Sequence, residues 1–218
     1  MSSVDGSRAA TRATQDMTAR ARIRDAAIEL FGERGFRATT VRAIAEHAGV
    51  SAALVVHHFG SKDGLRQAVD DHLADDIRAD KFAALSSGVG LDTKSARTAI
   101  AEHAAVFSYL SRALTEGTEA GAHLYDRLFH DAVDYMKAAQ DAGLVQATAD
   151  PAARAAALLN AGLAQTLLHH HLQRVLGEGD QVEALVRITP SLLDLYTDGL
   201  FTDSRFRDQW DPPPQEES

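Results

Sequence analysis

The sequence of 218 residues contains no cysteine, so it can form neither a disulfide bridge nor a cysteine-ligated zinc site. It has no run of about eighteen apolar residues, which excludes a helix that spans a membrane. The N-terminal segment lacks the apolar stretch of a secretory signal. These absences predict a protein that stays in the reducing cytoplasm and has no membrane partner.

The sequence also lacks the short patterns of common catalytic sites. It has no nucleophile elbow, no phosphate-binding loop and no paired-carboxylate arrangement. Three consecutive histidines, His169 to His171, raise the question of a metal site. Successive helical residues point about 100° apart, so three in a row cannot ligate one ion from one helix. We predict no enzyme activity, no cofactor and no metal, and expect these histidines to face a ligand or a second subunit.

Charge is unevenly distributed along the chain, which has a net charge of −9. Residues 1–66 hold ten Lys and Arg against seven Asp and Glu, whereas the remainder holds twelve against twenty-four. A mildly basic segment attracts phosphates, and an acidic segment is repelled by them. The distribution favours a nucleic-acid-binding head and a body that stays away from DNA.

Two short helices joined by a tight turn are predicted within residues 39–65. Thr40 and Ser51 are residue types that cap helix N-termini, and apolar residues follow each at helical spacing. Gly49 tolerates the positive φ that the turn requires. The pattern predicts a helix-turn-helix whose second helix, Ala52 to His58, lies in the major groove of DNA.

The segments AAIELFGERGFRATTVRAIAEHAGVS and HHFGSKDGL make Ile23 to Leu65 resemble the DNA-binding domain of the TetR family of bacterial transcriptional regulators. The resemblance implies an all-α fold: a three-helix DNA-binding domain at 18–62, then a larger helical ligand-binding and dimerisation domain at 63–202. Residues 1–17 and 203–218 are predicted to be disordered, because they are polar and lack periodicity.

The expected DNA-binding residues lie around the two helices. They are Thr40, Arg42, Ser51, Ala52, Ala53, Leu54, Val56, His57 and Lys62. The family usually has tyrosine at Val56 and often lysine or alanine at Gly60, so this chain lacks two phosphate contacts that position such a domain. The apolar side chains of the second helix can touch thymine methyl groups but cannot make bidentate hydrogen bonds to bases. The polar side chains that remain to read bases are those of Arg42, Ser51 and His57.

Both ends of the chain leave alternatives open. Arg8 and Arg12 could form an arm that enters a minor groove, or the whole segment could be a solvated tail. Near the other end, Trp210 could dock on the body or be exposed.

The rest of the chain is predicted to be a series of helices. One runs from Ser61 into the mid-80s and is the only continuous link between head and body, so we expect any signal between them to shift it. Further helices are expected over 92–115, 119–142, 151–176 and 181–200.

The last two of these helices are rich in leucine and alanine on more than one face. In the TetR family the corresponding helices pair with their symmetry mates as a four-helix interface, which the resemblance implies here. Ala161 and Gly162 permit close helix approach. A twofold dimer presents two reading helices to successive major grooves and so reads a palindrome.

Aromatic and polar residues alternate on the middle helices, as a small-molecule pocket or an ordinary core requires. With the family resemblance, we favour a pocket for a mostly apolar or aromatic ligand. Its expected residues are His103, Phe107, Leu110, Tyr125, Phe129 and His169. The function predicted is a homodimeric repressor that a small organic ligand releases from a palindromic operator. The alternative, motivated by Val56 and Gly60, is a helical small-molecule-binding or interaction protein with weak or lost DNA binding.

Overall fold

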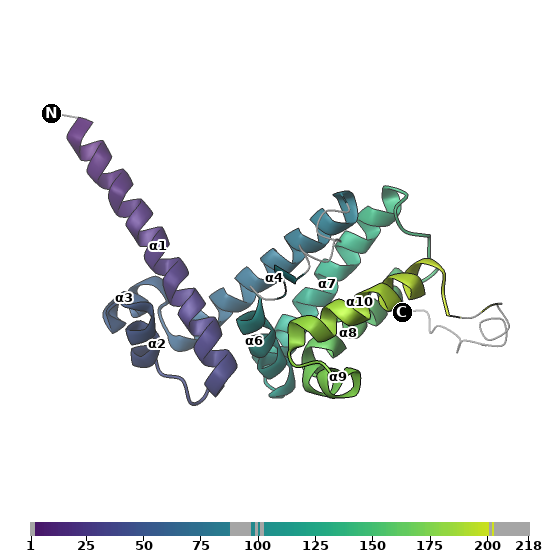
Figure 1. Cartoon of the computed structure of the whole chain (residues 1–218). Helices are drawn as coiled ribbons and strands as arrows, with labels where there is room; N and C mark the ends of the chain where they lie inside the picture. The colour runs from purple at the N-terminus through teal and green to yellow at the C-terminus, as the bar shows by residue number, and fades with distance from the viewer. Residues whose placement is uncertain (1–2, 88–96, 99, 101–102, 201, 203–218) are drawn as a thin grey trace.

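The computed structural model of the chain consists of helices and loops (Figure 1). It describes residues 3–87, 97–98, 100, 103–200 and 202, with side chains throughout these ranges except at 3–16, 86 and 87. The helices are α1 (Ser3–Arg34), α2 (Val41–Ala48), α3 (Ala52–Phe59), α4 (Lys62–Ser87), α6 (Ala104–Thr115), α7 (Glu119–Asp141), α8 (Pro151–Leu167), α9 (His169–Leu176) and α10 (Gln181–Thr197). The all-α prediction is confirmed. None of the helices in the described ranges is long and apolar enough to cross a membrane.

The second half of α1 packs with α2 and α3 into a three-helix head, against which α4 begins. The hydroxyl of Thr40 accepts a hydrogen bond from Ala43 N at 3.1 Å, and that of Ser51 accepts from Leu54 N at 3.2 Å. Gly49 ends α2 with a φ of 64°. The buried core of the head contains Ile23, Leu30, Phe31, Ile44, Val55 and Leu65. The predicted helix-turn-helix and both of its caps are therefore confirmed.

The first helix is longer than the sequence predicted. We expected it to begin at Thr18, after a disordered segment, but α1 begins at Ser3 and projects beyond α2 and α3 (Figure 1). Residues 7–15 are mostly alanine, arginine, threonine and glutamine and contain no glycine or proline, so nothing interrupts helical propagation there. The side chains of Arg8 and Arg12 lie outside the described residues, as does Trp210.

The helices of the body follow the predicted order with one break. A single helix was expected from Pro151 to Leu176, but the backbone leaves helical geometry at Leu168, with φ −106° and ψ 18°. The Nδ1 atom of His169 donates to Thr166 O at 2.9 Å. Such a local side-chain bond competes with the backbone for that carbonyl, which explains why the helix divides into α8 and α9. In the segment expected to be helical from residue 92, α6 begins at Ala104, and 92–96 lie outside the described residues.

Head and body are joined in two places. The chain passes continuously through α4, as predicted, but the C-terminal part of α1 also packs along α6. Gly32 makes this approach possible, because a Cβ atom there would lie 3.0 Å from Tyr109 N and 3.2 Å from Ser108 Cβ. The contact between α1 and α6 thus gives head and body a second connection beside α4, which the sequence did not predict.

Candidate nucleic-acid interface

The recognition helix α3 turns most of its apolar residues to solvent. Ser51, Ala52, Ala53, Val56 and His57 are exposed, and Leu54 is partly so. On the opposite face, Val55 and Phe59 are buried in the head. Burial on this side fixes α3 against α1 and α2, so its other face is presented as a rigid surface. The residues expected to face the bases are therefore accessible in the subunit.

The N-terminus of α2 is a second exposed part of the head. Thr40 and Arg42 are exposed there, and Arg37 is exposed in the preceding loop. The Thr40 hydroxyl accepts the capping bond described above, which leaves its proton for a phosphate oxygen. A helix N-terminus also favours an anion. Sequence reasoning found two of these residues and missed Arg37, which no motif marks.

Lys62 has a different environment from the one expected of a phosphate contact. Its ammonium donates to Phe36 O at 2.9 Å and to Thr39 O at 3.0 Å. It also lies 4.2 Å from the centre of the Phe36 ring. Two of its three N–H donors are thus used on the loop between α1 and α2. In the free protein Lys62 holds that loop, and with it the start of α2.

Arg22 supports the turn from the other side and was missed by sequence reasoning. Its guanidinium donates to the carbonyls of Ala48 and Gly49, at the C-terminus of α2. A cation is favoured there by the helix dipole. A Cβ atom on Gly49 would lie 2.7 Å from the Arg22 Nη2 atom. Gly49 is therefore required for its positive φ, and a side chain at this position would displace the Arg22 guanidinium.

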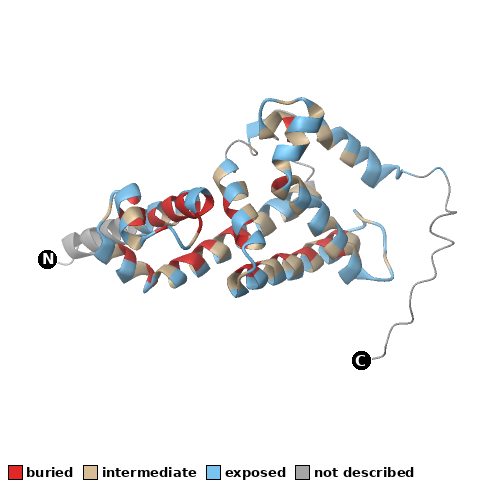
Figure 2. Cartoon of the chain, turned by 90° about the horizontal axis from the view of Figure 1, so that it is seen from below, coloured by how far each residue is buried: buried red, intermediate tan, exposed pale blue. Residues whose placement is uncertain are grey.

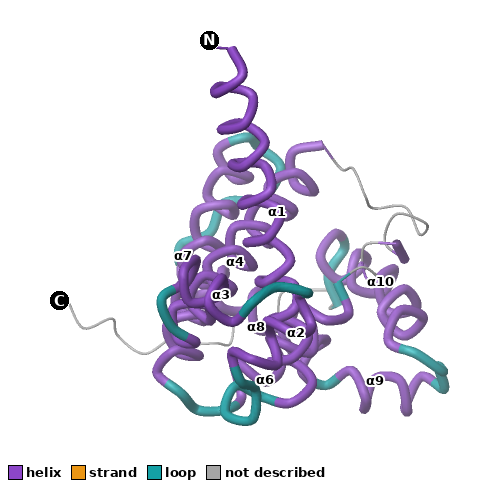
Figure 3. The backbone as a smooth tube through the Cα atoms, turned by 90° about the vertical axis from the view of Figure 1, so that its left-hand side faces the viewer, coloured by secondary structure: helices purple, strands orange, loops and turns teal. Residues whose placement is uncertain are grey.

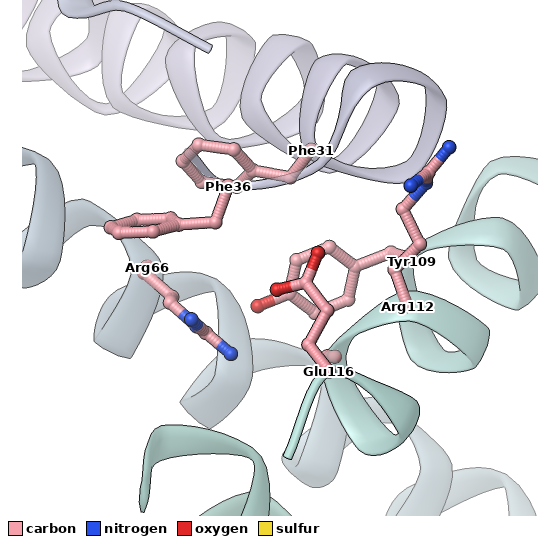
Figure 4. Close-up of a pocket in the computed structure, with 7 residues that line it drawn as sticks. Phe31, Phe36, Arg66, Tyr109, Arg112 and Glu116 are labelled. Carbon is pink, nitrogen blue, oxygen red and sulfur yellow. The ribbon is translucent and has the colours of Figure 1, made fainter. Parts of the chain in front are cut away.

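A compact polar cluster lies where α1, α4 and α6 meet (Figure 4). The structure has a cavity of about 10 Å³ here, close to the space that one water molecule needs. Its lining consists of Phe31, Phe36, Arg66, Tyr109, Arg112, Ala113 and Glu116. Next to it, the Tyr109 hydroxyl donates to Asp70 Oδ1 at 2.5 Å. Burial raises the pKa of Asp70 from 3.8 to about 6, partly offset by the bond from Tyr109 and by the charge of Arg66. Burial and the Asp70 carboxylate likewise raise the pKa of Tyr109.

The residues expected to bind a ligand do not line this cavity. Leu110 is buried, and the other expected residues (His103, Phe107, Tyr125, Phe129 and His169) are half-buried. The Tyr125 hydroxyl donates to Asn160 Oδ1 at 3.2 Å across α7 and α8. The rings of His169 and His170 are 3.8 Å apart. Among the described residues, no group of three or more metal-ligating side chains is found.

Two family descriptions match separate parts of the chain. Residues 23–69 match "Bacterial regulatory proteins, tetR family", which covers the head and the start of α4. Residues 101–202 match "Tetracyclin repressor-like, C-terminal domain", which covers α6 to α10. The boundary between the two matches falls within and after α4, where the head joins the body.

Individual proteins of known name resemble the chain over most or part of its length. The HTH-type transcriptional regulatory protein RaaS of Mycobacterium tuberculosis is 42% identical over 194 residues, which cover 86% of this chain and 89% of that protein. The HTH-type transcriptional repressor KstR2 of Rhodococcus jostii is 36% identical over 97 residues, or 41% of this chain and 48% of that protein. Bacillus subtilis FadR, solved with stearoyl-CoA, has a TM-score of 0.56 at 14% identity, covering 83% of this chain and 99% of that one.

Proposed function

The chain belongs to the TetR family of bacterial regulatory proteins, and we propose that it is a homodimeric repressor which a small organic ligand releases from a palindromic operator. As its relatives indicate, it is a DNA-binding transcriptional regulator. The alternative of a helical carrier without useful DNA binding is not favoured by these relatives. The dimer, the operator, the direction of regulation and the ligand are the parts proposed here.

The observation that supports DNA reading most directly is the exposed face of α3. Three consecutive small side chains at its start, Ser51, Ala52 and Ala53, leave an exposed face slim enough for the major groove. Arg37 and Arg42 flank it and supply positive charge for phosphates. Because the exposed side chains are mostly methyl-bearing, we propose that thymine methyl contacts contribute to the choice of bases.

Exposed small and apolar residues on α8 and on α10 support the proposed dimer. We call the exposed residues Ala161, Gly162, Leu193, Leu195 and Tyr196 the α8–α10 surface. A Cβ atom on Gly162 would meet nothing within 4 Å in the subunit. Two copies joined here would bury this surface in a four-helix contact. The twofold axis would place the heads at major grooves about 34 Å apart, or at a multiple of that distance.

Repression is proposed because two similar proteins carry the name of a repressor. A regulator that occupies its operator only when free of ligand must bind ligand more tightly in a DNA-incompetent state. Transcription in vitro from a promoter that overlaps the selected operator tests the direction. We expect transcript to fall on addition of the protein, and a rise would assign activation instead.

The proposed ligand site lies among α6, α7 and α8, which pack against one another, and the start of α9. Phe107 and Phe129 would contact an apolar ligand, and His103, Tyr125 and His169 would offer hydrogen bonds beside Leu110. A long-chain acyl-CoA is a sensible first probe, because B. subtilis FadR was solved with stearoyl-CoA. Binding should raise the melting temperature and release operator DNA in parallel. A probe that binds without releasing DNA would contradict its assignment as effector.

Selection from a pool of random duplexes tests the central proposal. We expect a palindrome to be enriched, with affinity that falls steeply as salt rises because phosphate counterions are released. Ala53→Asp places a negative charge on the groove face of α3 and should abolish enrichment. Ala138→Asp adds the same charge to the exposed side of α7 and should have no effect. Failure of the parent protein to enrich any palindrome would favour the carrier alternative.

A further inference from the structure

The C-terminus of α1 is capped by a side chain from the body. The last carbonyl groups of an α-helix have no partner within the helix. Arg112 of α6 donates from Nε to Gly32 O at 2.6 Å and from Nη2 to Glu33 O at 3.0 Å. A cation at this end also complements the helix dipole. The body thus completes the helix that supports the recognition pair.

The same face of α6 also holds α4. Tyr109, one turn before Arg112, donates its hydroxyl to the Asp70 carboxylate. Arg66 approaches the other Asp70 oxygen at 3.9 Å and donates to Thr118 Oγ1, in the turn after α6, at 3.2 Å. Arg66 is 7% exposed and Asp70 is 14% exposed, so water competes little for these contacts.

The contacts of α6 with α1 and with α4 both lie next to the loop that precedes α2. The guanidinium of Arg66 lies 4.9 Å from the centre of the Phe36 ring, and Lys62 bonds to the carbonyl of the same residue. Phe36 also packs on Phe31, whose ring faces Tyr109. Figure 4 shows the Arg66 guanidinium and the Tyr109 hydroxyl pointing toward one another, with Phe36 beside Arg66. A rotation of α6 would therefore be transmitted to α1 and α4 together.

We propose that Tyr109 and Arg112 are positioning residues, which set the orientation of the DNA-binding head by holding α1 and α4 to one face of α6. They contact no DNA themselves. In a dimer, the orientation of each head determines the spacing and direction of its recognition helix relative to its partner's. The two side chains therefore determine which operator spacing the protein accepts. This inference rests on the proposed palindromic operator.

The test measures the DNA affinity of variants on two kinds of duplex. Palindromes of different spacing report the relative orientation of the two heads, and a single half-site reports the contacts of one head with DNA. Tyr109→Phe removes one hydroxyl, and Arg112→Met removes both bonds to α1. Each is measured on the selected palindrome, on palindromes with the spacer changed by one or two base pairs, and on a single half-site. We expect about tenfold weaker binding to the palindrome, half-site binding unchanged within about twofold, and a flattened spacer preference.

Matched control variants make the same chemical changes away from the contacts of α6 with α1 and α4. Tyr135→Phe removes the hydroxyl of a half-buried tyrosine on α7, and Arg154→Met removes a side chain that bonds Gln146 O and Gln140 Oε1. Both should keep the spacer preference of the parent. Arg112→Lys keeps the charge with a single-point donor and should be intermediate. A parent-like spacer preference in folded Tyr109→Phe and Arg112→Met would overturn the proposal.

A second measurement does not depend on the operator. Because the chain has no cysteine, Glu46→Cys places a single spin label on the exposed side of α2 in each subunit. The distance distribution between the two heads should shift or broaden in Tyr109→Phe and Arg112→Met but not in the controls. If the parent selects no palindrome, the proposed function fails. The distance distribution still tests whether Tyr109 and Arg112 position the heads. An unchanged distribution would overturn it.

Discussion

The head and the far end of the body bury their apolar residues to different extents. The largest fully buried side chains of the described residues all lie between residues 23 and 69, in the head and the adjoining part of α4. At the other end, Leu168, Val175, Leu193, Leu195 and Tyr196 are exposed. Figure 2 shows buried segments concentrated in the head, and exposed faces along the helices at the far end.

The difference indicates that the head completes its core within one chain, whereas α8, α9 and α10 do not. Figure 3 shows α9 and α10 set apart from the α4 and α7 pair, and α10 packs chiefly on α9. Clusters of exposed large apolar residues mark interaction surfaces more often than single ones do. A second copy of the chain, paired through the α8–α10 surface, would complete the core at this end.

The largest effect on stability is expected from the head core. Phe31 is 2% exposed and contacts the rings of Phe36 and Tyr109. Phe31→Ala should lower the free energy of unfolding by about 3–5 kcal/mol, because it removes buried surface and leaves a cavity. Phe82→Ala, at a half-buried position far along α4, is the matched control and should cost less than half as much. Urea unfolding measures both, and equal losses would contradict the larger contribution expected from the head core.

The α8–α10 surface should tolerate change in the isolated subunit but not in the dimer. Leu193→Glu places a charge in the proposed interface, so the protein should sediment as a monomer. Operator affinity should fall by at least about a hundredfold, since the two heads would no longer bind together. Leu144→Glu makes the same change at a leucine that is 55% exposed after α7. This control should remain a dimer with parental affinity; a dimeric Leu193→Glu would place the interface elsewhere.

The contrast between local and distant contacts also explains which features the sequence could predict. The caps of the helix-turn-helix act on backbone groups only a few residues away. The residue types of Thr40, Gly49 and Ser51 therefore predict this motif directly. Lys62 bonds to carbonyls 23 and 26 residues earlier, and Arg112 to one 80 residues earlier. No local pattern encodes such pairings, so the sequence predicted neither the bonds from Lys62 to the loop nor the contact of Arg112 with α1.

The helix ends show the same limit. Proline after a capping aspartate predicted the start of α8 correctly, because both act on the first turn. The break at Leu168 was missed because it depends on one histidine rotamer reaching back to Thr166 O. The start of α1 was also missed, since the residues before Thr18 have modest helix propensity and include Gly6, and such a segment is compatible with either helix or coil.

A smaller effect on stability, which depends on pH, is expected from Asp70, where the head meets the body. The pKa of Asp70 is raised by burial to about 6, so the folded chain binds this proton more tightly than the unfolded chain does. The stabilisation from this group is complete below about pH 4 and is lost as pH rises through about 6. The full change is roughly 2–3 kcal/mol, at about 1.4 kcal/mol for each pKa unit.

Asp70→Asn cannot titrate and should lack this contribution. The stability of the parent relative to the variant, measured by urea unfolding, should therefore decrease between pH 4.5 and 7.5. Asp80→Asn, at an exposed position further along α4, is the control and should follow the parent curve. Parallel curves for the parent and Asp70→Asn would show that the Asp70 carboxyl does not titrate in this range.

The smallest expected effect is on the salt dependence of DNA affinity, and it distinguishes Arg42 from Lys62. Arg42 is exposed at the start of α2, whereas the Lys62 ammonium is bonded to two carbonyls. Arg42→Gln should reduce the slope of log affinity against log salt by about one unit, because one phosphate contact is lost. Lys62→Gln should weaken binding to all sequences alike, through the loosened loop, while the slope stays near the parental value. Gel shifts across a salt series measure both. An equal loss of slope in Lys62→Gln would mean that this ammonium leaves Phe36 and Thr39 for a phosphate in the complex.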